Sequence, residues 1–219
     1  WGGEVQNVSV LVAIGVSTSG FREILGVAEG SREDAESWRQ FLRYLRERGL
    51  EQIDLVVSDK SLGFLEALGE FYPEAKWQRC VVHFYRNVLH AVPRGKAKEV
   101  ALMLKAVHAQ EDKEAARRKS AEVISKLLAQ RLDKAARIVE SGCDETLSYY
   151  DFPVAHWRHI RTNNPLERLN REIRRRTRVV GSFPDGHAAL MLVAARLRYM
   201  AGQKWGTQRY MNMNQETSA

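Results

Sequence analysis

The sequence predicts an α/β protein in which a mixed sheet is interrupted by an all-α segment. Three observations support this class. Short runs of β-branched and apolar residues alternate with amphipathic helical segments over residues 1–92. Residues 93–148 are charged, alanine-rich and strongly helix-forming, which predicts a helical insertion. Aromatic residues then mark a return to the first domain over 149–205, before a polar tail at 206–219.

The elements of the first part follow from hydrophobic pattern and turn chemistry. Strands are β-branched runs bounded by Gly and Ser, and helices carry apolar residues at helical spacing until a Gly or Pro ends them. Ser31 and Asp34 have the spacing of a capping box, which predicts the start of the first helix. The predicted elements in chain order are strand Val8–Val16, strand Phe21–Val27, helix Ala35–Leu45, strand Ile53–Val57, helix Phe64–Phe71, strand Trp77–Val82 and helix Phe84–Ala91.

The second half is predicted to be helical. Lys96–Glu140 forms the insertion, with apolar stripes on otherwise charged sequence. Thr162, Asn163 and Asn164 are candidate N-caps, and Pro165 suits the first turn of an arginine-rich helix that runs to about Arg176. Asp185 caps a last helix, Gly186–Met200.

Several protein classes are excluded by composition. No apolar run approaches the roughly 20 residues that a membrane helix needs, so no membrane partner is expected. Two cysteines are too few for a disulfide framework, and they favour a reducing, intracellular setting. The chain begins at Trp1 without a recognisable signal peptide.

The net charge of +7 is concentrated in one stretch. Arg158 to Arg178 hold eight arginines against Glu167 and Glu172, a local charge of +6. Residues 1–76 instead carry a charge of −5. Because planar guanidinium groups bind phosphate oxygens bidentately, this stretch predicts that a polyanion docks on one face. A solvated basic helix or a localisation patch is the alternative.

Glu167 lies in the first turns of the arginine-rich helix, where the helix dipole and an ion pair with Arg171 would account for it structurally. A seven-residue step puts Arg174 on the same face as Glu167. The other arginines are expected to spread over other sides: Arg168, Arg171, Arg175 and Arg178. A carboxylate for a divalent cation among groups that hold phosphates is what phosphoryl transfer on nucleic acid requires.

Asp59, Cys80 and His83 are further candidates for the functional site. Asp59 follows a predicted buried strand, where open α/β sheets present functional groups, although an Asx turn or helix cap would also explain it. Cys80 and His83 form a Cys-x-x-His pair, but a structural zinc site needs four ligands and Cys143 offers no finger-like partner. The pair could instead pack, with His83 orienting a neighbouring carboxylate. His156 and His159 flank Trp157 just before the arginine-rich stretch and are candidates for the same site, with a surface location as the alternative.

Five segments together resemble the Mutator-type transposases of bacterial insertion sequences. The longest and most specific is Thr162–Phe183 (TNNPLERLNREIRRRTRVVGSF), and the match extends in order over essentially the whole chain. The others are Val10–Val16 (VLVAIGV), Arg22–Val27 (REILGV), Leu55–Asp59 (LVVSD) and Trp77–Asn87 (WQRCVVHFYRN).

The resemblance implies an RNase H-like core with an Asp-Asp-Glu triad and an all-α insertion before the final catalytic helix. Asp59 matches the second aspartate, Glu167 the glutamate and Arg174 the basic residue seven positions beyond. Cys80 and His83 match a Cys/Asp-x-x-His signature beside the core, which implies a site-supporting role. The first aspartate and the region that binds terminal repeats would precede Trp1, so this chain is expected to bind DNA without cleaving it efficiently.

The resemblance also implies cofactors and partners. Two Mg²⁺ (or Mn²⁺) ions would be held by Asp59, Glu167 and the upstream aspartate. The expected partners are terminal inverted repeats, target DNA and a second copy in a homodimer, in the bacterial cytoplasm and associated with the nucleoid. Further arginines would bind DNA: Arg168, Arg171, Arg175, Arg176 and Arg178. The alternatives are a decayed, non-catalytic DNA- or partner-binding remnant, another RNase H-like nuclease or resolvase, and a structural helical protein.

Overall fold

The computed structural model of the chain describes residues 9–30 and 34–213. These residues form two compact units, each of which is described by itself. The first unit comprises residues 9–30, 34–54, 61–75 and 164–213, and the second comprises 55–60 and 76–163. Both strands and helices are present and helices predominate, which confirms the predicted α/β class in its broad form.

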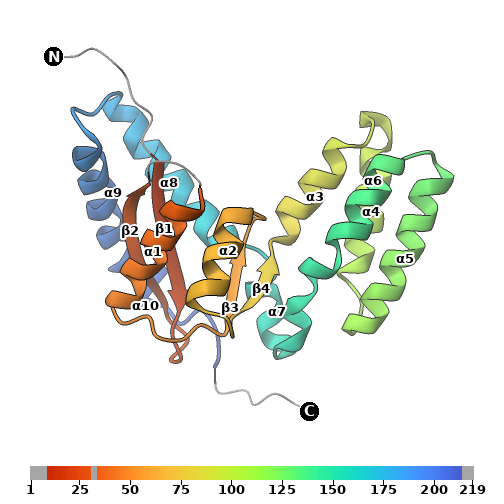
Figure 1. The fold of residues 1–219 in the computed structure, drawn as a ribbon, viewed down its shortest axis with the longest axis horizontal. Helices are drawn as coiled ribbons and strands as arrows, with labels where there is room; N and C mark the ends of the chain where they lie inside the picture. The colour runs from red at the N-terminus through yellow and green to blue at the C-terminus, as the bar shows by residue number, and fades with distance from the viewer. Residues whose placement is uncertain (1–8, 31–33, 214–219) are drawn as a thin grey trace. The chain divides into compact units, whose positions relative to one another are not determined.

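The first unit is built on an antiparallel hairpin (Figure 1). Val12 pairs with Val27 and Ile14 with Ile24, so β2 carries an extra residue, Leu25, at a bulge. The predicted hairpin is therefore confirmed, with a second strand that continues to Gly30. The elements of this unit are β1 (Ser9–Val16), β2 (Arg22–Gly30), α1 (Ala35–Glu47), α2 (Leu62–Phe71), α8 (Asn164–Val180), α9 (Gly186–Ala201) and α10 (Lys204–Thr207).

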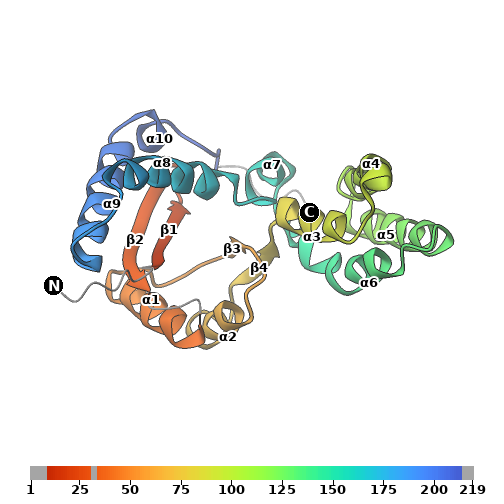
Figure 2. The ribbon, with the colours of Figure 1, turned by 90° about the horizontal axis from the view of Figure 1, so that it is seen from above.

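Helices cover both faces of this hairpin (Figure 2). Leu169 and Ile173 of α8 and Leu197 of α9 are buried against the alternate apolar residues of β1 and β2. On the other face, Gly26 of β2 lets α1 approach closely, because a Cβ there would lie 2.6 Å from a methyl carbon of Leu45. Alternation along the strands thus supplies two apolar faces, and the hairpin anchors the helix that carries Glu167.

Helix α1 begins at Ala35 as predicted, but its N-cap differs from the predicted one. Asp34 is itself the N-cap, since its Oδ1 accepts a hydrogen bond from Ser37 N at 2.8 Å. The expected capping box placed Asp34 three residues inside the helix and Ser31 at the cap, and Ser31 lies outside the described residues. An aspartate is as good a cap as a serine, so the helix begins where the first available carboxylate meets its amides.

The second unit consists of a parallel strand pair and a helical bundle. β3 and β4 pair from Leu55 opposite Lys76 to Ser58 opposite Arg79. Its strands and α-helices are β3 (Leu55–Ser58), β4 (Lys76–Arg79), α3 (Val81–His90), α4 (Ala97–Val107), α5 (Lys113–Ala129), α6 (Asp133–Gly142) and α7 (Trp157–Ile160). Single 3-10 turns connect them: η1 (Arg94–Lys96), η2 (Asp144–Thr146), η3 (Ser148–Asp151) and η4 (Val154–His156).

The predicted strand Trp77–Val82 is too long at its C-terminal end. β4 stops at Arg79, and Val81 and Val82 belong to α3. Cys80 N makes the last hydrogen bond of the parallel ladder, to Ser58 O at 2.8 Å. The chain then leaves the ladder, because Val81 N donates to Arg161 O at 3.1 Å and Cys80 O accepts from Phe84 N at 3.0 Å as α3 begins. These contacts override the β propensity of the two valines.

The described residues contain two two-stranded sheets, antiparallel β1–β2 in the first unit and parallel β3–β4 in the second, so the single mixed sheet is not confirmed. The RNase H-like arrangement therefore remains a prediction. Residues 93–148 contain helices and turns without a strand. Their apolar faces pack on α3 in one core that includes Phe84, Val88, Leu104 and Leu127.

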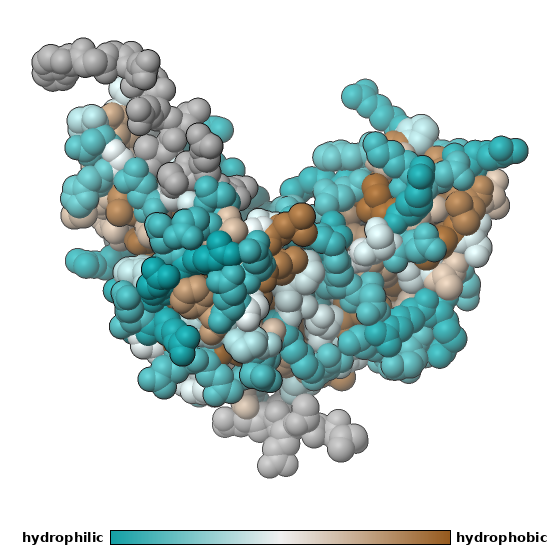
Figure 3. All heavy atoms as spheres, in the orientation of Figure 1, coloured by the Kyte–Doolittle hydropathy of each residue, from teal (hydrophilic) through white to brown (hydrophobic). Residues whose placement is uncertain are grey.

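The surface is mainly hydrophilic on the face shown in Figure 3, with apolar side chains in small scattered groups. Exposed large apolar residues include Leu62, Val154 and Val179, which lie far apart in the chain. No helix among the described residues combines the length and apolarity that crossing a membrane requires.

Candidate functional site

Asp59 lies directly after β3, where the paired ends of β3 and β4 bring the next residues of both strands together. Its side chain is 52% exposed, and its Oδ2 lies 3.9 Å from His83 Nδ1 at the start of α3. Its Oδ1 accepts a hydrogen bond from Lys60 N at 2.8 Å. One backbone amide thus fixes the carboxylate while leaving it open to solvent, and His83 faces it as a potential positive charge.

Cys80 is fully buried between β4 and α3. Its thiol donates a hydrogen bond to Asn163 Oδ1 at 3.0 Å. The other cysteine, Cys143, lies in the helical core of the same unit. Across residues 9–30 and 34–213, no three His, Cys, Asp or Glu side chains gather closely enough to hold a metal ion. The zinc interpretation of the Cys-x-x-His pair therefore has no support within those ranges.

Glu145 fixes the surroundings of Asp59 from the end of the helical insertion. One of its oxygens pairs with Lys60 Nζ at 2.5 Å and the other with Arg79 Nη1 at 3.0 Å. The guanidinium of Arg79 is nearly buried and lies 5.3 Å from the ring centre of Phe84. A Cβ at position 142 would lie 2.5 Å from Arg79 Nη1, so Gly142 leaves the room this cation needs.

The helix α8 carries Glu167 and the arginines of the basic stretch in the first unit. Because α8 is continuous to Val180, Glu167, Arg171, Arg174 and Arg178 fall within a sector of about 60° around its axis. The expectation that Arg171 and Arg178 lie on other sides is therefore wrong. Glu167 is half-buried and the three arginines are exposed, so the stripe joins a carboxylate to a row of cations.

The arginines of α8 differ in their partners. Arg175 binds both oxygens of Glu172, at 2.8 and 3.0 Å, and Arg176 lies 3.7 Å from the same carboxylate. Arg196 of α9 adds another contact to Glu172. Hydrogen bonds from Arg175 and then Arg196 lower the pKa of Glu172 to about 2. Four exposed arginines of α8 have no carboxylate of the described residues within 4.0 Å: Arg168, Arg171, Arg174 and Arg178.

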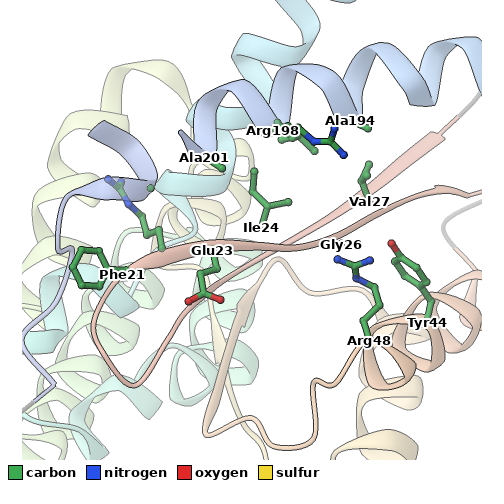
Figure 4. Close-up of a pocket in the computed structure, with 13 residues that line it drawn as sticks. Phe21, Glu23, Ile24, Gly26, Val27, Tyr44, Arg48, Ala194, Arg198 and Ala201 are labelled. Atoms are coloured by element: carbon green, nitrogen blue, oxygen red, sulfur yellow. The ribbon is translucent and has the colours of Figure 1, made fainter. Parts of the chain in front are cut away.

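A groove of about 610 Å³ follows β2 in the first unit, between α1 and α9 (Figure 4). Three arginines and one acid line it. Arg48 donates to Leu25 O at 3.1 Å, and Arg22 stacks 4.6 Å from the ring centre of Tyr210. Arg198 and Glu23 complete the charged lining, which contains none of the predicted site residues.

Asp59 and Glu167 belong to different units, so their convergence stays a prediction. Asn163, which Cys80 holds in the second unit, precedes Glu167 by four residues in the chain. Sequence reasoning treated Asn163 only as a possible cap and did not single out Glu145. Asn163 contacts Cys80, 83 residues away in the chain, and Glu145 contacts Arg79, 66 residues away. No local sequence pattern predicts contacts between such distant residues.

Comparison with known proteins identifies the family to which the chain belongs. The Mutator family of transposases matches residues 2–206, nearly the whole chain, and the chain belongs to this family. It is 39% identical over 213 residues to the transposase for insertion sequence element ISRM5 of Rhizobium meliloti, covering 97% of this chain and 53% of that protein.

Two further relatives agree. The chain is 38% identical over 217 residues to the transposase for IS1081 of Mycobacterium tuberculosis, covering 99% of this chain and 52% of that protein. It is 32% identical over 212 residues to the transposase for IS256 in transposon Tn4001 of Staphylococcus aureus, covering 96% and 54%. The chain thus spans about half the length of these curated relatives.

Proposed function

We propose that this chain is the catalytic part of an insertion-sequence transposase that cuts the transposon end and joins it to target DNA. The observation that supports this proposal most is the arrangement around Asp59 at the end of β3 in the second unit, which we call the Asp59 corner. There the exposed Asp59 follows a parallel strand pair and faces His83. A family of transposases supplies the reaction class, and the α8 arginines supply groups for a nucleic-acid backbone.

The donor set fits a hard divalent cation. Carboxylate oxygens are the ligands that Mg²⁺ and Mn²⁺ prefer, and Asp59 is exposed and oriented by a backbone amide. Asp59 and Glu167 would hold the metal, with two ions in the complete enzyme. Bound divalent metal supplies positive charge that stabilises the attacking and leaving oxygens of phosphoryl transfer. The first aspartate, which the resemblance assigns to a position before β1, would complete the donor set in a longer protein.

The side chains of this chain would position the DNA. Arg174, seven residues beyond Glu167 on the same stripe, would hold a phosphate beside the attacked bond. Arg171 and Arg178 extend the row, and their lack of acidic partners within the described ranges leaves them ready for phosphate oxygens. His83 would orient the Asp59 carboxylate.

The RNase H-like core is part of the same proposal. Within the described ranges, β1 and β3 each pair with a single neighbour, so each has an edge that a further strand can join. The resemblance assigns such a strand, with the first aspartate, to a position before β1. The greater length of the relatives leaves room for it and for a region that binds terminal repeats. Bringing two transposon ends together favours a homodimer, with the protein gathered on nucleoid DNA.

The test uses a longer protein that restores the upstream strand, with Mg²⁺-dependent nicking of an inverted-repeat duplex as the measurement. Asp59→Asn and Glu167→Gln should each lower the nicking rate at least a hundredfold, because metal binding supplies several kcal/mol of transition-state stabilisation. DNA affinity should stay within about twofold. Asp54→Asn, an exposed acid outside the site, is the matched control. Nicking indifferent to both changes would rule the proposal out.

A DNA-binding remnant without catalysis is the second candidate. It is favoured by the absence of a three-acid cluster within the described ranges, together with the row of exposed arginines. In that case Glu167→Gln leaves every measured property intact, while Arg171→Ala and Arg174→Ala weaken DNA binding. If the longer protein hydrolyses DNA without forming strand-transfer products, the activity is that of a nuclease and not of a transposase.

A further inference from the structure

Cys80 lies where three segments of the second unit meet. Its backbone N–H donates to Ser58 O, the residue before Asp59, at 2.8 Å. Its thiol contacts Asn163, and the next residue, Val81, donates through its N–H to Arg161 O at 3.1 Å. The end of β3, the start of α3 and the segment that leads into α8 are therefore joined at one buried side chain.

The contact between Cys80 and Asn163 has two parts. The thiol donates to Asn163 Oδ1 at 3.0 Å, and the sulfur accepts from Asn163 N at 3.5 Å. Cys80 is completely buried, so water does not compete for either bond. With the Val81–Arg161 bond beside it, the segment before α8 is attached to this corner at two neighbouring points.

We propose that Cys80 and Asn163 form a positioning pair that fixes the start of α8, and thereby Glu167, with respect to Asp59. The inference rests on the proposed function, in which Asp59 and Glu167 hold the same metal. Neither member of the pair touches DNA or metal. Their effect reaches Glu167 through four residues of chain, of which Asn164 already begins the helix. A carboxylate on a helix whose first turn is held is oriented at lower entropic cost.

The chemistry of the pair predicts which replacements it accepts. Serine keeps a donor and an acceptor on a side chain of similar size, so Cys80→Ser preserves both bonds. Cys80→Ala removes both bonds of the pair, and Asn163→Ala removes the acceptor of the thiol, so each variant loosens the segment although the Val81–Arg161 bond remains. Cys143→Ala is the matched control, because Cys143 is the other buried thiol of this unit and belongs to the helical core.

The experiment measures Mn²⁺ affinity of the 219-residue chain by electron paramagnetic resonance. Asp59→Asn and Glu167→Gln first establish that both carboxylates bind the ion. Cys80→Ala and Asn163→Ala should then weaken Mn²⁺ binding about tenfold, the usual effect of removing a group that orients a ligand. Their affinity for duplex DNA, carried by the exposed arginines of α8, should change less than twofold. Cys80→Ser and Cys143→Ala should bind Mn²⁺ as the wild type does.

The outcomes separate the two proposals. If Mn²⁺ binding is insensitive to Asp59→Asn and Glu167→Gln, the proposed metal site fails, and the positioning role fails with it. If those two variants lose affinity but Cys80→Ala and Asn163→Ala keep it, the positioning role alone is overturned. A loss of Mn²⁺ affinity in only one of the variants Cys80→Ala and Asn163→Ala also overturns the positioning role. Circular dichroism of each variant identifies any that fails to fold, and Asn163→Ala, at the unit's partly exposed margin, then decides the question together with Cys80→Ser.

Discussion

At the residue scale, His108 shows how the helical core treats a polar side chain. Both ring nitrogens have partners, Nδ1 with the Tyr85 hydroxyl at 2.9 Å and Nε2 with Thr146 Oγ1 at 2.7 Å. Burial lowers the pKa of His108 to about 4 despite the nearby Leu104 carbonyl, which acts to raise it. The folded protein therefore favours the neutral form of the His108 imidazole, whereas the same side chain in the unfolded chain takes up a proton more readily.

The unfolding free energy should consequently depend on pH through His108. The folded pKa lies below the unfolded value of about 6.5, so this stability is complete above pH 6.5 and declines as the pH falls toward 4. Between pH 7 and pH 5 the loss should be about 2 kcal/mol. Urea denaturation of His108→Gln should show a pH dependence smaller by that amount, whereas the exposed His90→Gln should match the wild type. Equal dependence in all three would contradict the assignment.

At the element scale, α8 combines two kinds of arginine. Arg175 must leave Glu172 before it can bind a phosphate, whereas Arg171 and Arg174 have no acidic partner to leave within the described ranges. The same hydrogen bond from Arg175 to Glu172 is the main cause of the low pKa of Glu172. The local charge of +6 counted from the sequence therefore overstates the number of cations that are free for DNA.

This difference should appear in the salt dependence of DNA binding. Arg174→Ala should reduce the slope of log affinity against log salt by about 0.9, the contribution of one phosphate contact. Arg175→Ala should reduce it less, and Glu172→Gln should strengthen binding by releasing Arg175 and Arg176. Fluorescence anisotropy with one duplex between 50 and 200 mM salt, conditions chosen for a large effect, measures all three. Identical slopes for the two alanine variants would show that the ion pairs do not matter.

At the scale of the whole molecule, the helical insertion shares its core with α3. Phe84 and Val88 of α3 pack in the same cluster as Leu127 of α5, and all three are fully buried. The helix that carries His83 is thus held by residues from the insertion. Stability of the insertion and order at the Asp59 corner are consequently coupled.

A neighbouring pair of leucines tests this coupling. Leu127→Ala should lower the unfolding free energy by about 3 kcal/mol and reduce amide protection along α3, because it leaves a cavity in the shared core. Leu128→Ala, at an exposed position, should change either property by less than about 0.5 kcal/mol. Hydrogen exchange followed by mass spectrometry measures both. Full protection of α3 in Leu127→Ala would mean that the two parts are stable separately.

Much of the local structure could be predicted because its causes are local. The hairpin of β1 and β2 follows from alternation and a Ser/Gly turn, and α8 and α9 follow from helical spacing and caps. The end of β4 could not be predicted, because Val81 N bonds to Arg161 O, which is distant in sequence. The cap of α1 moved by three residues for a simpler reason, since two acceptable caps stand close together.

The sequence by itself determined the family, the order of strands and helices, and the residue types of the candidate site, because these depend on motifs and on periodicity along the chain. Only the tertiary structure decided that His83 faces Asp59, that Cys80 binds Asn163 and that Glu172 neutralises part of the arginine helix. The first two contacts depend on where the backbone brings distant segments together. The third depends on which of several nearby charges lie within hydrogen-bond distance once α8 packs against α9.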